Sequence, residues 1–108
     1  MNADQIPTLI SRYQALSDQE KVACLASLSH ALTVDARYYV SERPSIEKLS
    51  VINELQHQIS SMIGHLSVKD DKRYPDDVFV RILFDKAEPT FIGKRLVDAI
   101  ARIEDRQL

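Results

Sequence analysis

The stretch Ser41-Glu42-Arg43-Pro44-Ser45 separates two long segments in which apolar residues recur at every third or fourth position. Pro44 disfavours helical geometry at the preceding residue, and Ser45 has a side chain suited to capping the start of a helix. Because connections this short usually join antiparallel helices, the pattern predicts a long helical hairpin at the centre of the fold.

The two arms of this hairpin carry their own start signals and apolar stripes. Ser17-Asp18-Gln19-Glu20 matches a capping box, so the first arm is expected to begin there and to run to about Ser41. The second arm follows Ser45, and its apolar positions are Leu49, Ile52, Leu55, Ile59, Met62, Ile63 and Leu66. Each arm therefore presents one face that suits a shared core.

Three shorter helices are expected outside the hairpin, each with a proline near its start. The first begins near Asp4, contains Pro7 in its first turn and ends at Leu16. The last opens at Pro89-Thr90 and carries an apolar stripe.

The remaining helix is expected from Asp76 to about Lys86, after Pro75. Its residues Val78–Phe84 are also rich in strand-favouring types, so a strand is the alternative for this segment. The preceding stretch, Ser67–Tyr74, contains a run of mixed charge and is predicted to be a solvated loop.

Length and composition limit the kinds of protein this chain can be. The 108 residues are enough for one domain, expected to span residues 1–108, and 44% hydrophobic with 28% charged residues is typical of a globular protein. A net charge of −2 gives no general attraction to nucleic acid or anionic lipid. No apolar run approaches the roughly 20 residues of a membrane span. We expect an all-α protein, a four- or five-helix bundle around the hairpin, without a nucleic-acid or membrane partner.

The cysteine content bears on location and on chemistry. Cys24 is the only cysteine, so no internal disulfide can form, and the N-terminus lacks the features of a secretory signal. We therefore expect a cytoplasmic protein. Cys24, His30 and Asp35 do not share a helical face, so they do not form a nucleophilic set, and a buried structural thiol is expected.

Both arms of the hairpin show small or uncharged residues where an ordinary solvent face would carry Lys and Glu. On the second arm this side contains Ser50, Asn53, Glu54, His57, Ser61, Gly64 and His65, and on the first arm it contains Ala23, Cys24, Ser27, Ala31, Val34 and Tyr38. In an antiparallel hairpin, residues equidistant from the turn are level, which places His30 beside His57. The hairpin is expected to be buried on two sides, either by its own shorter helices or by a second copy in a homodimer.

One motif in the second arm points to a metal. Glu54-Leu55-Gln56-His57 has the Glu-x-x-His spacing of carboxylate metal sites in helical bundles, and His30 is a further candidate ligand. This donor set suits Zn, Fe or Mn. A di-metal site needs two such motifs, which only a dimer can supply. In the alternative, structural interpretation, Glu54 and His57 form a hydrogen-bonded pair at the surface or at an interface.

Asn53-Glu54-Leu55-Gln56-His57 followed by Arg73-Tyr74-Pro75-Asp76-Asp77-Val78-Phe79 resembles short bacterial helical proteins that have no assigned activity. The resemblance extends back to Leu16–Lys21 and covers about two thirds of the chain. It implies a bacterial, intracellular helical protein and carries over no catalytic residues.

These patterns favour a non-enzymatic interaction or regulatory protein that requires no cofactor, such as an immunity protein, an antitoxin or an adaptor. A homodimer is expected, and a different protein partner is possible on the same surface. The predicted interaction residues are Ser50, Glu54, His57, Ser61 and His65. The alternative is a metal-binding enzyme or sensor that uses His30, Glu54 and His57.

Overall fold

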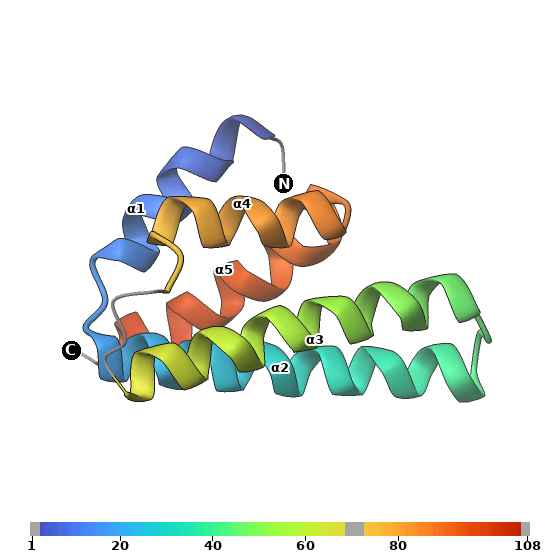
Figure 1. The fold of residues 1–108 in the computed structure, drawn as a ribbon. Helices are drawn as coiled ribbons and strands as arrows, with labels where there is room; N and C mark the ends of the chain where they lie inside the picture. The colour runs from blue at the N-terminus through green and yellow to red at the C-terminus, as the bar shows by residue number, and fades with distance from the viewer. Residues whose placement is uncertain (1–2, 69–72, 107–108) are drawn as a thin grey trace.

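A computed structural model of the protein describes residues 3–68 and 73–106 (Figure 1). Over these two ranges the chain is helical and contains no strand. The elements are a 3-10 turn at Ala3–Gln5, α1 at Ile6–Gln14, α2 at Asp18–Ser41, α3 at Ile46–Ser67, α4 at Asp76–Lys86 and α5 at Pro89–Arg106. The predicted all-α bundle around a long antiparallel hairpin is confirmed.

The hairpin of α2 and α3 has the register that the short turn predicts. The side-chain amide of Gln56 donates hydrogen bonds to the Ser29 carbonyl at 3.1 Å and to the Thr33 hydroxyl at 2.8 Å. Ser29 and Thr33 lie on either side of Ala31, the α2 residue that is as far from the turn as Gln56 is. Ser45 caps α3, because its hydroxyl accepts a hydrogen bond from the Lys48 backbone amide at 3.2 Å.

The start of α2 is the predicted capping box. The Ser17 hydroxyl accepts from the Glu20 backbone amide at 3.2 Å, and the Glu20 carboxylate accepts from the Ser17 amide at 2.9 Å. The preceding helix, α1, ends at Gln14 and so stops short of the predicted end at Leu16. Ser17 needs extended backbone angles to act as the cap, so the chain leaves the helix before that residue.

The segment for which a strand was the alternative is a helix. Its buried residues lie three or four positions apart, which places them on one face of α4. They are Phe79, Val80, Leu83 and Phe84. Of the predicted loop Ser67–Tyr74, Ser67 is the last residue of α3, and residues 69–72 lie outside the described residues.

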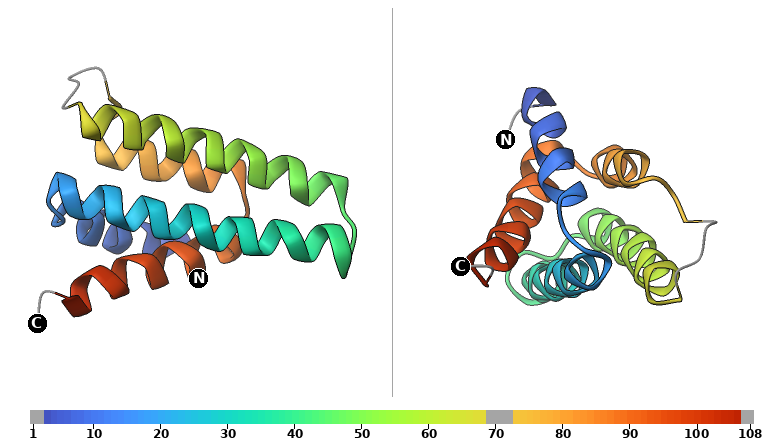
Figure 2. Two further views of the ribbon diagram at one scale, coloured as in Figure 1. Left: turned by 90° about the horizontal axis from the view of Figure 1, so that it is seen from below. Right: turned by 90° about the vertical axis from the view of Figure 1, so that its left-hand side faces the viewer.

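The shorter helices all pack on the same face of the hairpin. Figure 1 shows α1 and α4 above α2 and α3, and the view from below in Figure 2 shows the hairpin in front of these two helices, with α5 beside α2. The core between these layers includes Leu25, Leu28 and Leu32 from α2 and Ile52, Leu55 and Ile59 from α3. No described helix combines the length and apolar composition needed to cross a bilayer.

The two arms differ in how completely this layer covers them. Cys24 of α2 is fully buried, the Arg95 guanidinium of α5 binds the Asp35 carboxylate, with one bond at 2.9 Å, and Arg102 reaches the Ser27 hydroxyl. Thus the predicted second side of α2 is buried only in part: Cys24 is buried and Ser27 contacts α5, whereas Val34 and Tyr38 are 50% and 46% exposed. The predicted polar side of α3 is not covered in the same way, since most of its residues are exposed. Within one chain, the predicted second side of the hairpin is therefore only partly buried.

The closed end of the hairpin projects beyond the other helices (Figure 1). Val40 and Ile46, on either side of the turn, are exposed to 63% and 86%, and the residues between them are exposed or half-buried. The residues on either side of the turn are therefore little covered by the shorter helices.

Candidate interaction surface

The side of the hairpin that faces away from the core is a continuous exposed surface, which we call the hairpin face. Its positions follow one helical stripe on each arm, opposite the buried leucines and isoleucines. The hairpin face consists of Ala26, His30, Val34 and Arg37 on α2, of Ile46, Ser50, Asn53, His57, Ser61 and Gly64 on α3, and of Val68 directly after α3.

The hairpin face is unusual in its lack of charge. Charged residues make up 28% of the chain, yet Arg37 is the only one among the residues of this face. Three of its apolar side chains are well exposed: Val34 to 50%, Ile46 to 86% and Val68 to 72%. An apolar and uncharged surface costs little to remove from water, so this face is suited to contact with another macromolecule.

The predicted interaction residues fall on this face or at its edge. Ser50, His57 and Ser61 are exposed members of the hairpin face. Glu54 is also exposed but lies toward α4, where its carboxylate is 3.9 Å from the Lys86 ammonium. His65 is half-buried on the same edge of α3. Ile46 and Val68 were not among the predicted interaction residues, although continuing the same spacing to both ends of α3 identifies them.

The alternative metal set is not assembled in one copy of the chain. His30 and His57 are exposed and lie on different arms, while Glu54 is directed to the α4 side by Lys86. The hollow beside Glu54 and His57 is open and is otherwise lined by Asn53, Gln56 and Ser60. Among the described residues, no three His, Cys, Asp or Glu side chains are close enough to hold a metal ion.

The described residues also lack a nucleophilic site around the cysteine. Cys24 is completely buried in the core, and this burial raises the pKa of its thiol to about 12. Since the thiolate is the reactive form, the thiol is inert at neutral pH. His30 is exposed on another face of α2, and Asp35 binds Arg95.

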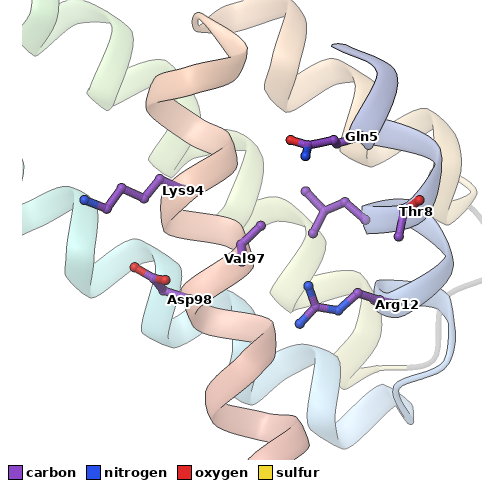
Figure 3. Close-up of a pocket in the computed structure, with 7 residues that line it drawn as sticks. Gln5, Thr8, Arg12, Lys94, Val97 and Asp98 are labelled. Atoms are coloured by element: carbon purple, nitrogen blue, oxygen red, sulfur yellow. The ribbon is translucent and has the colours of Figure 1, made fainter. Parts of the chain in front are cut away.

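A groove between α1 and α5 is a second hollow in the surface (Figure 3). Its volume is about 590 Å³, and its lining includes Leu9, Arg12 and Val97. Arg12 is engaged by Glu104 through two bonds at 2.5 and 3.2 Å, which lowers the pKa of the Glu104 carboxyl. In Figure 3, Lys94 and Asp98 project from the side of α5 away from Arg12. The groove thus combines apolar surface with a guanidinium that Glu104 neutralises, and its other lining residues are Gln5, Thr8, Lys94 and Asp98.

Two basic side chains close to the starts of α4 and α5 are paired with acids. Arg73 lies 3.2 Å from Asp18, and Arg95 is held by Asp35. Lys69 and Lys72 lie outside the described residues. The geometry therefore favours the hairpin face over a catalytic, metal or nucleic-acid site. Comparison with models of protein families, with curated proteins and with solved structures finds no match for this chain.

Proposed function

We propose that this protein acts without catalysis, as a homodimeric interaction or regulatory protein whose working surface is the hairpin face. One observation carries the proposal: a surface that follows both long helices has a single charged residue, Arg37, in a chain that is 28% charged. Charged residues are depleted in the buried centres of protein interfaces, whereas they dominate ordinary solvent faces.

The distribution of apolar side chains supports self-association in particular. Ile46 and Val68 lie at opposite ends of α3 and Val34 lies on α2, so the exposed apolar groups span the face. Small side chains, such as Ser50 and Gly64, lie between them and allow close approach of a second helix. A small domain that leaves one layer uncovered gains buried apolar area when it pairs with its own copy.

The single buried cysteine is consistent with a cytoplasmic protein, because a reducing compartment requires no disulfide. An immunity protein, an antitoxin or a small adaptor works by binding, and each fits a domain with an interaction face and no catalytic set. A second type of protein would have to use a surface outside the dimer contact.

The proposal is tested by absolute mass from light scattering on a sizing column, at concentrations from high to low micromolar. We expect a mass near twice 12.3 kDa. His57→Asp should raise the dimer dissociation constant more than tenfold, since it places a charge in the middle of the face. Lys94→Ala is the control, because Lys94 is an exposed residue of α5 that does not belong to the hairpin face. A monomer at every concentration, or equal effects of the two substitutions, would overturn the proposal.

A further inference from the structure

We propose that a hollow at the closed end of the hairpin binds a small phosphorylated molecule with an aromatic ring, of the chemistry and size of a nucleoside monophosphate. The hollow lies at the turn, where α2 and α3 project beyond the shorter helices (Figure 1). Its volume is about 370 Å³, which is within the ordinary range of small-molecule sites. Its lining consists of Tyr38, Tyr39, Arg43, Pro44, Ser45 and Lys48.

The hollow lies where the core-facing stripes of the two arms run beyond the core. On α3, Lys48 precedes the buried Ile52 by four positions and therefore lies on the same side of the helix. On α2, Tyr39 follows the buried Leu32 by seven positions, about two turns, and packs against the edge of the core. An ammonium group and an aromatic ring thus occupy positions that apolar core residues hold further along the same stripes. The hollow is on the opposite side of the hairpin from the hairpin face.

The two cations of the hollow are available to bind an anion. Arg43 and Lys48 are exposed, and neither forms an ion pair with a described residue. Among the described residues, no Asp or Glu lines the hollow, because the exposed Glu42 and Glu47 lie outside its lining. A guanidinium and an ammonium at one concave surface favour an anion with several oxygen atoms, such as phosphate. The cations in ion pairs between described residues are Arg12, Lys21, Arg73, Lys86 and Arg95.

The two tyrosines indicate that the anion carries a ring. The rings of Tyr38 and Tyr39 meet edge to face, with their centres 5.2 Å apart. Tyr38 is 46% exposed, so its ring offers surface on which a planar group can stack. Inorganic phosphate would leave this aromatic surface in water, whereas a nucleoside monophosphate contacts both the ring and the cations.

The backbone of the turn holds these groups in place before any ligand arrives. The Tyr38 carbonyl accepts hydrogen bonds from the Glu42 and Arg43 amides, both at 3.0 Å. The Tyr39 carbonyl accepts from the Ser45 amide, also at 3.0 Å. Binding therefore does not have to order the turn, which lowers its entropic cost. The lining contains no residue of the hairpin face, so this inference does not depend on the dimer.

NMR titration of the isotope-labelled full chain with adenosine monophosphate tests the site, and inorganic phosphate and adenosine are titrated separately. We expect saturable shifts of the amide signals of residues 38–48. Arg43→Gln, Lys48→Gln and Tyr38→Ala should each raise the dissociation constant at least about fivefold, since each removes a charged contact or the stacking surface. All three side chains are exposed, so the variants should keep the fold. Arg81→Gln is the matched control, because Arg81 is an exposed cation of α4 that does not line the hollow.

Weaker binding by each of the three variants, with unchanged binding by Arg81→Gln, supports the inference. If inorganic phosphate or adenosine binds as tightly as adenosine monophosphate, the hollow does not recognise the ring and the phosphate together, and the inference is overturned. Equal weakening by Arg81→Gln overturns it as well, because it indicates attraction to the overall surface charge. The same holds if the three variants bind like the wild type, or if millimolar adenosine monophosphate causes no saturable shift.

Discussion

The Lys21 ammonium lies 2.9 Å from the Asp76 carboxylate, and their side chains are only 6% and 15% exposed. The pair joins the first turn of α2 to the first turn of α4, and the ammonium also lies 5.5 Å from the centre of the Tyr13 ring. The contact fixes α4 against the start of the hairpin. It also places a charge where water has little access, which makes each partner dependent on the other.

Asp76→Asn is expected to lower the free energy of unfolding by about 3 kcal/mol, because it leaves the buried Lys21 charge with only the longer contact to Asp18 at 3.9 Å. Urea unfolding followed by circular dichroism measures the change. Asp77→Asn is the control: Asp77 is exposed in the same helical turn, so its loss should cost about 0.3–1 kcal/mol through the helix dipole alone. Equal losses for the two variants would contradict a special role for the pair.

Tyr13→Phe is expected to leave stability unchanged or to raise it by about 1 kcal/mol. The Tyr13 hydroxyl is buried and has no hydrogen-bond partner among the described residues, so its removal relieves an unpaid desolvation cost. The ring itself stays, including its tilted contact with Phe79 at 6.2 Å between ring centres. Chemical denaturation of the two proteins side by side decides the sign. A loss of more than about 1 kcal/mol would show that the hydroxyl is satisfied, for example by a water molecule.

Stability is expected to fall as the pH rises above about 9. Burial raises the pKa of the Cys24 thiol from 9.0 to about 12, so the unfolded chain loses this proton at a lower pH than the native protein does. The stabilisation from the neutral thiol is therefore complete below pH 9 and is lost between pH 9 and 12. Burial also raises the pKa of Tyr13, which acts in the same direction at higher pH. The urea concentration at the midpoint of unfolding, measured between pH 8 and 11, should fall less steeply with pH for Cys24→Ala than for the wild type. The same pH dependence in both proteins would show that the Cys24 thiol does not cause the loss of stability.

Glu104→Gln is expected to cost less than about 1 kcal/mol at neutral pH, because the ion pair with Arg12 is partly exposed to solvent. The hydrogen bond from Arg12 lowers the pKa of Glu104, so the pair contributes above the ordinary carboxyl range and is lost as the pH falls through the lowered value. The wild type and Glu104→Gln should therefore converge in stability at acidic pH. Asp105→Asn, an exposed neighbour, should show no such convergence.

The sequence was sufficient for the features that depend on neighbouring residues. Ser17 and Glu20 lie in one helical turn, and the short turn around Pro44 fixes the antiparallel hairpin and its register. The strand alternative for Val78–Phe84 could not be dismissed locally, since β-branched and aromatic residues suit both elements. Its helical state becomes evident only when Phe79 and Leu83 are seen buried together on one face.

Other features depended on the packing order of the helices, which local patterns do not determine. Lys21 with Asp76, and Asp35 with Arg95, join residues far apart in the chain. The packing of α5 against α2 is likewise determined by tertiary structure, and it explains why the predicted polar side of α2 is partly buried while that of α3 is mostly exposed. The hairpin face was partly anticipated, because Ser50, His57 and Ser61 were identified by spacing alone.

Because the closed end of the hairpin projects beyond the other helices, the two ends of α2 differ in how strongly their backbone amides are protected from hydrogen exchange. Near Leu25 and Leu28 the backbone of α2 lies over the core, so its amide hydrogens should exchange only when the whole protein unfolds. Near Val40, and across the turn near Ile46, opening breaks contacts within the hairpin alone, so exchange there should be orders of magnitude faster. Along α2 the exchange rate should therefore rise toward the turn, and the open end of the hairpin, rather than the turn, should be the last part to unfold.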